Sequence, residues 1–365
     1  MTQSPVNFTF YLNQKEMISH LEGYVKALSL KATPLGSSQK GLIINEYQWG
    51  KGEKKMAVWS QMHGNESTGT FCIYDVLESL KSLSKEKYKA LESAISLHFI
   101  PMLNPDGADV YTRESANGMD LNRDSVDKST PEIQLFWKWM EELQPDLALN
   151  LHDQRSRFST DDKVATLSFL APSPNEEREV TSHRRLSMEC VAFMYKQLKQ
   201  EYSAGIGKYT DEFYPTATGD NLMAKGIPNV LFEAGADDIT PENRELAREM
   251  QSTAMWKLII WFSEKDKEGN PVKDFQTIYD SIPVNQVTKC DYLYQQTNTL
   301  SPLNNQYAAL DIIRSYHPQK GLTSVLQVRE VMKEPSLTNV YDLNFDLIQK
   351  LSLIYDLKEG ETIEL

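Results

Sequence analysis

Apolar runs along the chain alternate with stretches in which apolar and polar residues recur at helical spacing. Short apolar or alternating runs predict β-strands at Gly41–Trp49, Met56–Ser60, Ile95–Met102, Asp146–Leu151, Val164–Leu170 and Asn229–Glu233. Longer stretches with one apolar face predict helices at Thr68–Leu83, Pro131–Leu143, Glu176–Tyr202 and Pro241–Phe262. This alternation favours an α/β domain with a mixed or mostly parallel sheet.

The charged segment Glu264–Lys273 marks the predicted end of this domain. It contains Gly and Pro and follows the last strong helical pattern, as linkers do. Beyond it, tyrosine-rich and alternating stretches with a predicted helix at Asn344–Leu353 indicate a small α/β or β-rich appendage. We therefore predict an N-terminal extension (1–40), a main domain (41–265) and a C-terminal accessory region (274–365).

Composition narrows the class of partner. The formal net charge of -13 argues against binding to nucleic acid or anionic membranes, because phosphate binding needs clustered Lys and Arg. The sequence shows no secretory signal and no apolar window of membrane-spanning length, so the expected compartment is the cytoplasm. Cys72, Cys190 and Cys290 lie far apart and outside any CxxC pattern, which favours reduced thiols. The oligomeric state stays open.

Two of the six histidines stand where a metal site is expected. His63 follows the apolar run Met56–Ser60, and Glu66 comes three residues later, so a loop or first helical turn places both on one side. His152 follows another predicted strand, at the edge where α/β sheets present ligands. Two histidines and one glutamate, with a fourth position left to water, form a catalytic zinc site. The alternative is ordinary histidines hydrogen bonded to carboxylates.

Further polar residues follow the predicted strands. Burial of Glu233 would raise the pKa of its carboxyl group toward the range of a general base, although helix capping or arginine pairing is an alternative. The sequence Asn104–Gly107 (NPDG) predicts a turn. Near a metal, Arg113, Asn122 and Arg123 would bind a carboxylate and stabilise an oxyanion, whereas without one they would form a polar loop.

These pieces, taken in order, resemble the zinc carboxypeptidase family. The resemblance covers roughly Gly41–Phe262 and rests on HGNE (63–66), NPDG (104–107), Arg113, DLNR (120–123), His152 and FEAG (232–235). It implies an α/β/α sandwich around a twisted mixed sheet and one zinc ion per chain. It also implies His63, Glu66 and His152 as zinc ligands, Glu233 as general base and acid, Arg113 as the group that polarises the scissile carbonyl, and Asn122 and Arg123 as the grip on the substrate's terminal carboxylate.

The implied activity is hydrolysis of a C-terminal bond in a peptide or small amide that has a free carboxylate. The short interval from His63 to His152 favours the cytosolic carboxypeptidase and bacterial γ-D-glutamyl-diaminopimelate amidase branches. Digestive members carry a mobile tyrosine where this chain has Met223, and Tyr209 and Tyr214 are candidate substitutes. Candidate selectors of an acidic substrate side chain are Arg155, Arg157, Lys163 and Lys225.

Two other functions stay open. The succinylglutamate desuccinylase and aspartoacylase group, which removes acyl groups from amino acids, looks similar in HGNE, DLNR and the buried glutamate. Its members usually lack the full NPDG sequence, so peptide hydrolysis is favoured. A ligand-binding relative without catalysis is the second alternative, and the complete set of chemical groups argues against it. Cobalt or manganese could replace zinc in vitro.

Overall fold

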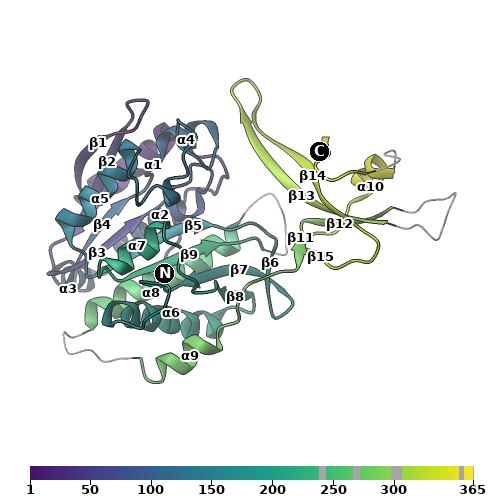
Figure 1. Cartoon of the computed structure of the whole chain (residues 1–365). Coiled ribbons are helices and arrows are strands. Elements are labelled where there is room, and N and C mark those ends of the chain that lie inside the picture. The colour runs from purple at the N-terminus through teal and green to yellow at the C-terminus, as the bar shows by residue number, and fades with distance from the viewer. Residues whose placement is uncertain (238–243, 266–271, 297–305, 353–356, 365) are drawn as a thin grey trace.

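Figure 1 shows the computed structural model, in which a large α/β unit is followed by a smaller β-rich region. The structure describes residues 1–237, 244–265, 272–296, 306–352 and 357–364. The strands of the main sheet are β1 (Lys31–Ser37), β2 (Ile43–Gly50), β3 (Lys54–Trp59), β4 (Ile95–Ile100), β5 (Leu147–Asp153), β6 (Phe158–Thr160), β7 (Lys163–Leu170), β8 (Gly205–Lys208), β9 (Asn229–Ala234) and β10 (Gln286–Val287).

The main sheet is mixed, with the strand order β1-β2-β4-β3-β5-β9-β7-β6-β10 and β8 paired to β7. Its centre is parallel: β3 pairs with β4 and β5, and β5 pairs with β9. The strands β1, β2 and β6 run antiparallel to their neighbours, and β7 runs antiparallel to β9. Because parallel strands end at the same edge, the residues at and after the ends of β3, β5 and β9 are brought together.

Helices cover both faces of this sheet. One face carries α1 (Gln14–Ala27), α2 (Thr68–Lys81), α3 (Lys85–Ala94), α6 (Ser182–Glu201), α8 (Glu245–Glu264) and α9 (Phe275–Ser281), and the other carries α5 (Pro131–Leu143) and α7 (Thr218–Ala224). Each face of the sheet has its own hydrophobic core, and alternate residues of β3 point into the two cores. Val58 lies in the core beneath α8, and Trp59 lies in the core beneath α5. The predicted α/β/α sandwich is confirmed.

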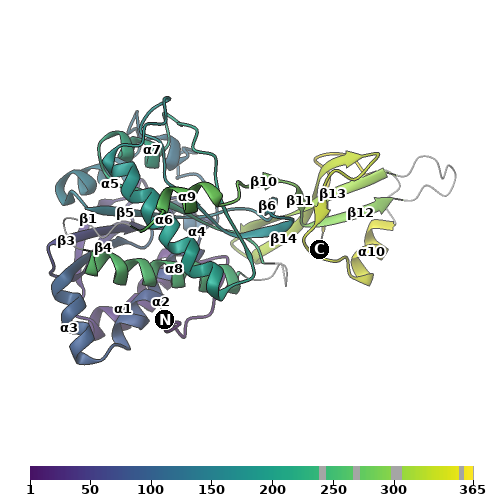
Figure 2. The same cartoon turned by 90° about the horizontal axis from the view of Figure 1, so that it is seen from below.

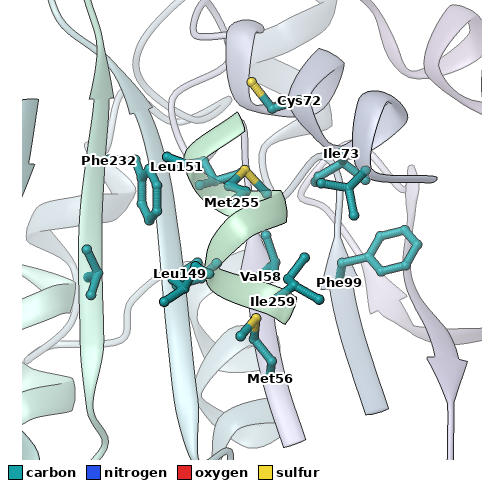
Figure 3. Close-up of a cluster of buried hydrophobic side chains, with 14 of the residues drawn as sticks. Met56, Val58, Cys72, Ile73, Phe99, Leu149, Leu151, Phe232, Met255 and Ile259 are labelled. Atoms are coloured by element: carbon teal, nitrogen blue, oxygen red, sulfur yellow. The ribbon is translucent and has the colours of Figure 1, made fainter. Parts of the chain in front are cut away.

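Figure 3 shows the first core, where side chains of α8 pack with those of the central strands. Met255 and Ile259 of α8 share this cluster with Val58, Leu149 and Phe232 of β3, β5 and β9. All five are nearly or fully buried. Burying a side chain of this size is worth about 1.5–3 kcal/mol, so this core fixes the strands that end at the site.

Element boundaries follow local signals. The helix α5 begins and ends as predicted, because Pro131 suits the first helical turn. The helix α6 begins at Ser182 rather than Glu176, because the Thr181 side chain accepts a hydrogen bond from the Arg184 amide and caps the helix. The predicted helix Pro241–Phe262 begins outside the described residues and corresponds to α8.

The NPDG sequence was expected to form a turn and instead begins a short helix. Pro105 is the first residue of α4 (Pro105–Val110). The Asn104 side chain caps this helix, since its oxygen accepts a hydrogen bond of 2.9 Å from the Gly107 amide. Asn and Pro are therefore the residues that begin a helix here. Both residues are also common in β-turns, so the sequence alone did not distinguish the two structures.

The N-terminal residues 1–40 contribute the helix α1 and the strand β1, which pairs with β2. The C-terminal region contains β11 (Lys289–Cys290), β12 (Tyr292–Gln296), β13 (Gln306–His317), β14 (Gly321–Met332), β15 (Thr338–Asn339), α10 (Phe345–Ser352) and β16 (Thr362–Glu364). A four-stranded sheet of order β12-β13-β14-β16 packs on α10 through its own core, which confirms a β-rich appendage.

Figures 1 and 2 show this region beside the main unit, with the long β13–β14 hairpin projecting from it. The exact domain boundaries stay a prediction, and residues 266–271 of the predicted linker lie outside the described residues. Among the described residues, no helix is long and apolar enough to cross a membrane. The three cysteines are buried free thiols, as predicted.

Candidate active site

Three side chains converge at the carboxyl edge of the parallel strands. His152 Nδ1 lies 3.0 Å from His63 Nδ1 and 2.8 Å from Glu66 Oε2, and His63 Nδ1 lies 2.9 Å from Glu66 Oε1. His63 comes from the turn after β3, Glu66 precedes α2, and His152 belongs to β5. All three are buried. The structure thus assembles the three predicted metal ligands into one cluster with ligand atoms within 4.8 Å of one another.

Asp120 contacts His63 at the ring nitrogen that faces away from the other two side chains. Its Oδ1 lies 3.0 Å from His63 Nε2, and its Oδ2 accepts a hydrogen bond of 3.0 Å from Arg113 Nε. Burial alone would raise the pKa of Asp120, but the hydrogen bond from His63 and the charge of Arg113 lower it overall. An ionised Asp120 accepts the Nε2 proton of His63, which leaves the Nδ1 lone pair facing the other ligands. Sequence reasoning assigned Asp120 no role, although it begins the DLNR motif.

Asp153 supports the cluster from the other side. Its amide donates to Glu66 Oε2 at 3.1 Å, and its carboxylate pairs with Arg244 at 3.0 Å. The Thr68 hydroxyl donates to the same carboxylate at 2.8 Å. The pKa of Asp153 is raised to about 6, mainly by burial; Arg244 opposes this rise and the negative charge of Glu66 adds to it. The sequence did not predict the ion pair between Asp153 and Arg244. Its only local signal is that Asp153 directly follows His152.

Glu233 stands beside His152, its register partner on the neighbouring parallel strand. Burial and then the charges of Glu66 and Asp153 raise the pKa of Glu233 well above its usual value. Arg113 reaches the same place, since its Nη1 donates to Glu66 Oε1 at 3.2 Å. The two predicted catalytic side chains therefore both lie against the cluster. Their roles stay predictions.

The predicted carboxylate grip lies on the short helix η1 (Leu121–Arg123), next to Asp120. The Asn122 amide donates to Asp120 Oδ1 at 2.8 Å, and its side-chain oxygen accepts from the Thr218 amide at 3.0 Å. The Arg123 guanidinium lies 4.5 Å from the ring centroid of Tyr214, which is 53% exposed. Both residues are thus held in place by neighbours.

A cleft of about 560 Å³ connects these groups. Its lining includes six of the seven predicted site residues: His63, Glu66, Arg113, Asn122, Arg123 and Glu233. Met223 is buried in α7 and does not line the cleft, so it cannot do the work of the missing tyrosine. Both candidate substitutes do line it: Tyr209, whose hydroxyl donates to Gln154 at 2.8 Å, and Tyr214.

Of the four cationic side chains considered as selectors of an acidic substrate, one lines the cleft. That residue is Arg155, which is exposed. The others are engaged elsewhere: Arg157 pairs with Asp311 at 3.4 Å, Lys163 donates to the Ser203 carbonyl at 2.6 Å, and Lys225 lies 5.5 Å from the ring centroid of Trp137.

A close backbone contact joins two of the sequence motifs. A Cβ atom on Gly64 would lie 2.1 Å from the carbonyl carbon of Gly107 and 2.2 Å from the amide nitrogen of Ala108. Only glycine allows the loop that carries His63 to touch α4 in this way. The HGNE and NPDG motifs therefore pack directly against each other through their glycines.

Comparison with known proteins shows to which family the chain belongs. The model of the zinc carboxypeptidase family matches residues 16–225, more than half of the 365-residue chain. The chain belongs to the zinc carboxypeptidase family. All the predicted ligands lie inside the matched segment, as do Arg113, Asn122 and Arg123, whereas Glu233 follows its end.

Curated relatives named as carboxypeptidases match over shorter segments. Carboxypeptidase SOL1 of Arabidopsis thaliana is 28% identical over 107 residues, which is 25% of this chain and 21% of that protein. Carboxypeptidase 2 of Trichophyton rubrum is 28% identical over 102 residues, 27% of this chain and 19% of that protein. The matched segments span about a fifth of the length of these relatives.

Solved structures share the fold of the main unit. A metallo-carboxypeptidase from Burkholderia cenocepacia superposes with a TM-score of 0.55 at 16% identity, covering 70% of each chain. Thrombin activatable fibrinolysis inhibitor superposes with a TM-score of 0.54 at 15% identity, covering 70% of this chain and 75% of that one. At these identities the likeness establishes the fold of the main unit.

Proposed function

We propose that this protein is a zinc-dependent metallocarboxypeptidase that hydrolyses a C-terminal peptide or amide bond. The observation that carries the proposal is the convergence of His63 Nδ1, His152 Nδ1 and the Glu66 carboxylate in one buried cluster. Their separations of 2.8–3.0 Å are close to those of ligand atoms around one cation, since zinc bonds of about 2.0–2.1 Å leave neighbouring ligands roughly 3 Å apart.

The charges around the cluster also suit a divalent cation. Among the residues that the structure describes, the guanidinium groups that act on the carboxylates of Glu66, Asp120, Asp153 and Glu233 are those of Arg113 and Arg244. Burial lowers the pKa of His152, which favours the neutral imidazole that binds metal. One zinc ion per chain would balance the excess negative charge. Zinc bound there would act as a Lewis acid on the scissile carbonyl and on the attacking water.

The chain's own groups supply the proton transfers. Glu233, whose pKa is raised by burial, would accept the proton of the attacking water and later deliver it to the departing amine. Arg113 lies beside Glu66 and would donate hydrogen bonds to the oxyanion that forms on the substrate carbonyl.

The substrate's end would be held at η1. The Arg123 guanidinium lies over the Tyr214 ring, and a guanidinium in that position would donate N–H groups to a carboxylate. Asn122 stands beside it on the cleft wall. We infer that a free terminal carboxylate binds there, so that the adjoining amide bond lies over the metal cluster.

The test is a substrate survey on zinc-loaded protein. Peptides with free or amidated C-termini are incubated together with N-acetyl and N-succinyl amino acids, and the products are read by mass spectrometry. We expect loss of C-terminal residues from free-carboxylate peptides alone, and no turnover after chelation. The Glu233→Ala variant should bind zinc but lose about 10²–10⁴-fold in kcat, the share that general base catalysis supplies.

The control is Glu142→Ala, which removes a glutamate whose side chain is 69% exposed on α5 and should change neither property. Near-normal turnover of Glu233→Ala would remove this residue from the mechanism. Release of acyl groups with intact peptides would assign the protein to the deacylase group. Zinc binding without turnover of any substrate would support the ligand-binding alternative.

A further inference from the structure

The strand β13 of the C-terminal region lines the cleft of the candidate active site. Its residues 311–314 line the same cleft as His63 and Glu233. Asp291 and Tyr341, also from the C-terminal region, line it as well. The match to the model of the zinc carboxypeptidase family ends at residue 225, before all of these C-terminal residues. This part of the cleft is therefore not supplied by the segment that the family model matches.

Polar contacts fasten the first end of this stretch of β13 to the loop after β5. The Asp311 carboxylate pairs with Arg157 at 3.4 Å. The Lys289 amide donates to the Arg157 carbonyl at 3.1 Å, and the Ser156 hydroxyl donates to the Asp291 carboxylate. Both aspartates are buried, so solvent ions screen these contacts only weakly. Because Ser156 itself lines the cleft, β13 is attached here to another part of the cleft lining.

Aromatic contacts fasten the other end to the N-terminal segment. The Tyr316 ring stacks on that of Tyr11, with centroids 4.2 Å apart and planes 2° apart. The Arg314 guanidinium lies 3.9 Å from the ring centroid of Phe10, which lines the cleft. The hydroxyl of Ser67, the residue after a candidate metal ligand, donates to the Phe10 carbonyl at 3.1 Å. The N-terminal segment that receives β13 is thus held next to the metal cluster.

Between these two attachments, β13 runs along the cleft. The distance along the strand from Asp311 to Tyr316 is roughly 17 Å, at about 3.3 Å per residue. Ile312 and Ile313 lie between them, are half-buried and line the cleft. Displacing this stretch would break its contacts at both ends, whereas a loop attached at one end would swing freely. We therefore expect β13 to keep its place when a substrate binds.

The size of the cleft suits a small ligand. Its volume is about 560 Å³. Clefts of about 300–1,000 Å³ enclose most of the surface of a drug-sized molecule, which is comparable to a short peptide. A long peptide whose C-terminal end is bound in the cleft has to leave it, and β13 occupies the side between the loop after β5 and the N-terminal segment.

We propose that β13 is a fixed wall that restricts this protein to short peptides. The proposal rests on the proposed carboxypeptidase function and names its substrate class: peptides of a few residues with a free C-terminal carboxylate. A long chain binds only if β13 moves or if the chain bends around Ile312 and Ile313, and either change uses binding energy that would otherwise stabilise the transition state. A short peptide fits without either change.

The test compares an N-acetylated tripeptide with an N-acetylated dodecapeptide that ends in the same sequence. Acetylation removes the N-terminal charge from both, so that the two substrates differ in length. The readout is the ratio of kcat/KM for the tripeptide to that for the dodecapeptide, measured with the zinc-loaded full chain. We expect a ratio of about tenfold or more, because exclusion acts on the transition state of the long substrate alone.

Two substitutions open the wall. Ile313→Ala shortens a side chain that lines the cleft, and Tyr316→Ala removes the stack on Tyr11. Each should lower the ratio by speeding cleavage of the dodecapeptide, and the double variant should lower it further. The matched control is Ile348→Ala, which shortens a 43% exposed isoleucine on α10 outside the cleft lining and should leave the ratio unchanged. Because both rates come from one sample, partial unfolding of a variant does not alter the ratio.

The outcomes separate this wall from the function on which it rests. A ratio near or below one in the unmodified protein would overturn the wall and leave the carboxypeptidase function intact. A high ratio that the double variant leaves unchanged would mean that another part of the cleft sets the length limit, which also overturns the role of β13. Failure to cleave any peptide with a free C-terminal carboxylate would overturn the proposed function itself.

Discussion

Asp120 joins three functional groups of the site through one carboxylate. It accepts hydrogen bonds from the His63 ring, from Arg113 and from the Asn122 amide. The orientation of a candidate metal ligand, of the proposed oxyanion donor and of the proposed carboxylate grip thus depends on the same side chain. Carboxylate partners of metal-binding histidines typically contribute 10–100-fold to metal affinity.

Replacing this carboxylate by its amide should therefore weaken zinc binding. In Asp120→Asn the oxygen acceptor for His63 remains but its negative charge is lost, so we expect about tenfold weaker zinc affinity, the lower end of that range. Competition with a chromophoric chelator measures it. Asp127→Asn, at an exposed position a few residues later, is the matched control. Equal affinity in the two variants would contradict a role for Asp120 in holding His63.

The candidate metal ligands could be predicted from sequence because His63 and His152 lie at or just after the end of an apolar strand and Glu66 follows His63 by three residues. The residues Phe10 and Arg314 could not. They meet through packing between segments that lie far apart in the chain, and neither segment carries a cluster of chemical groups. Likewise, the sequence shows that Arg155 and Arg157 are cations, but only the fold shows that Arg157 is paired.

At the scale of elements, two features position the candidate site: the parallel centre of the sheet and the contact between the His63 loop and α4. The strands β3, β5 and β9 were predicted from apolar runs that both helical layers bury. The edge strand β1 was not predicted, since its residues are only partly buried or exposed and show no apolar alternation. The short strands β6 and β8 lacked the length for a pattern.

The contact of Gly64 with α4 gives a prediction at this scale. In Gly64→Ala the added Cβ meets backbone atoms that cannot rotate away, so the loop and α4 have to separate. Overpacking of this kind costs about 1–3 kcal/mol, and the movement of His63 should weaken zinc binding as well. Urea unfolding and zinc titration measure the two effects.

Gly23→Ala is the opposing control. Gly23 lies within α1, is exposed and has no atom within 4 Å of an added Cβ. The same substitution there should raise stability by about 1 kcal/mol, because alanine is the better helix former. If both variants were stabilised, the Gly64 contact would not be the constraint that the structure indicates.

At the scale of the whole molecule, the C-terminal region matters through the hairpin that reaches back to the N-terminal segment. The strand β13 has 12 residues, and at about 3.3 Å per residue it spans roughly 40 Å, enough to bridge from its own sheet to the main unit. Its Tyr316 stacks on Tyr11, and the neighbouring Phe10 lines the cleft together with residues 311–314 of β13.

Removing the Tyr316 ring should therefore loosen the hairpin without touching the metal cluster. Stacked aromatic pairs contribute about 0.5–1.5 kcal/mol beyond the area they bury, so Tyr316→Ala should raise amide hydrogen exchange across residues 306–332. The same variant should retain zinc affinity, because the ring that it removes packs on Tyr11 and not on the candidate metal ligands. Phe158→Ala, which removes an aromatic contact with Tyr209 elsewhere at the cleft, controls for general damage to the site.

Unchanged hydrogen exchange in Tyr316→Ala would mean that other contacts hold the hairpin in place. Faster exchange together with weaker zinc binding would show that the position of the hairpin affects the candidate metal ligands.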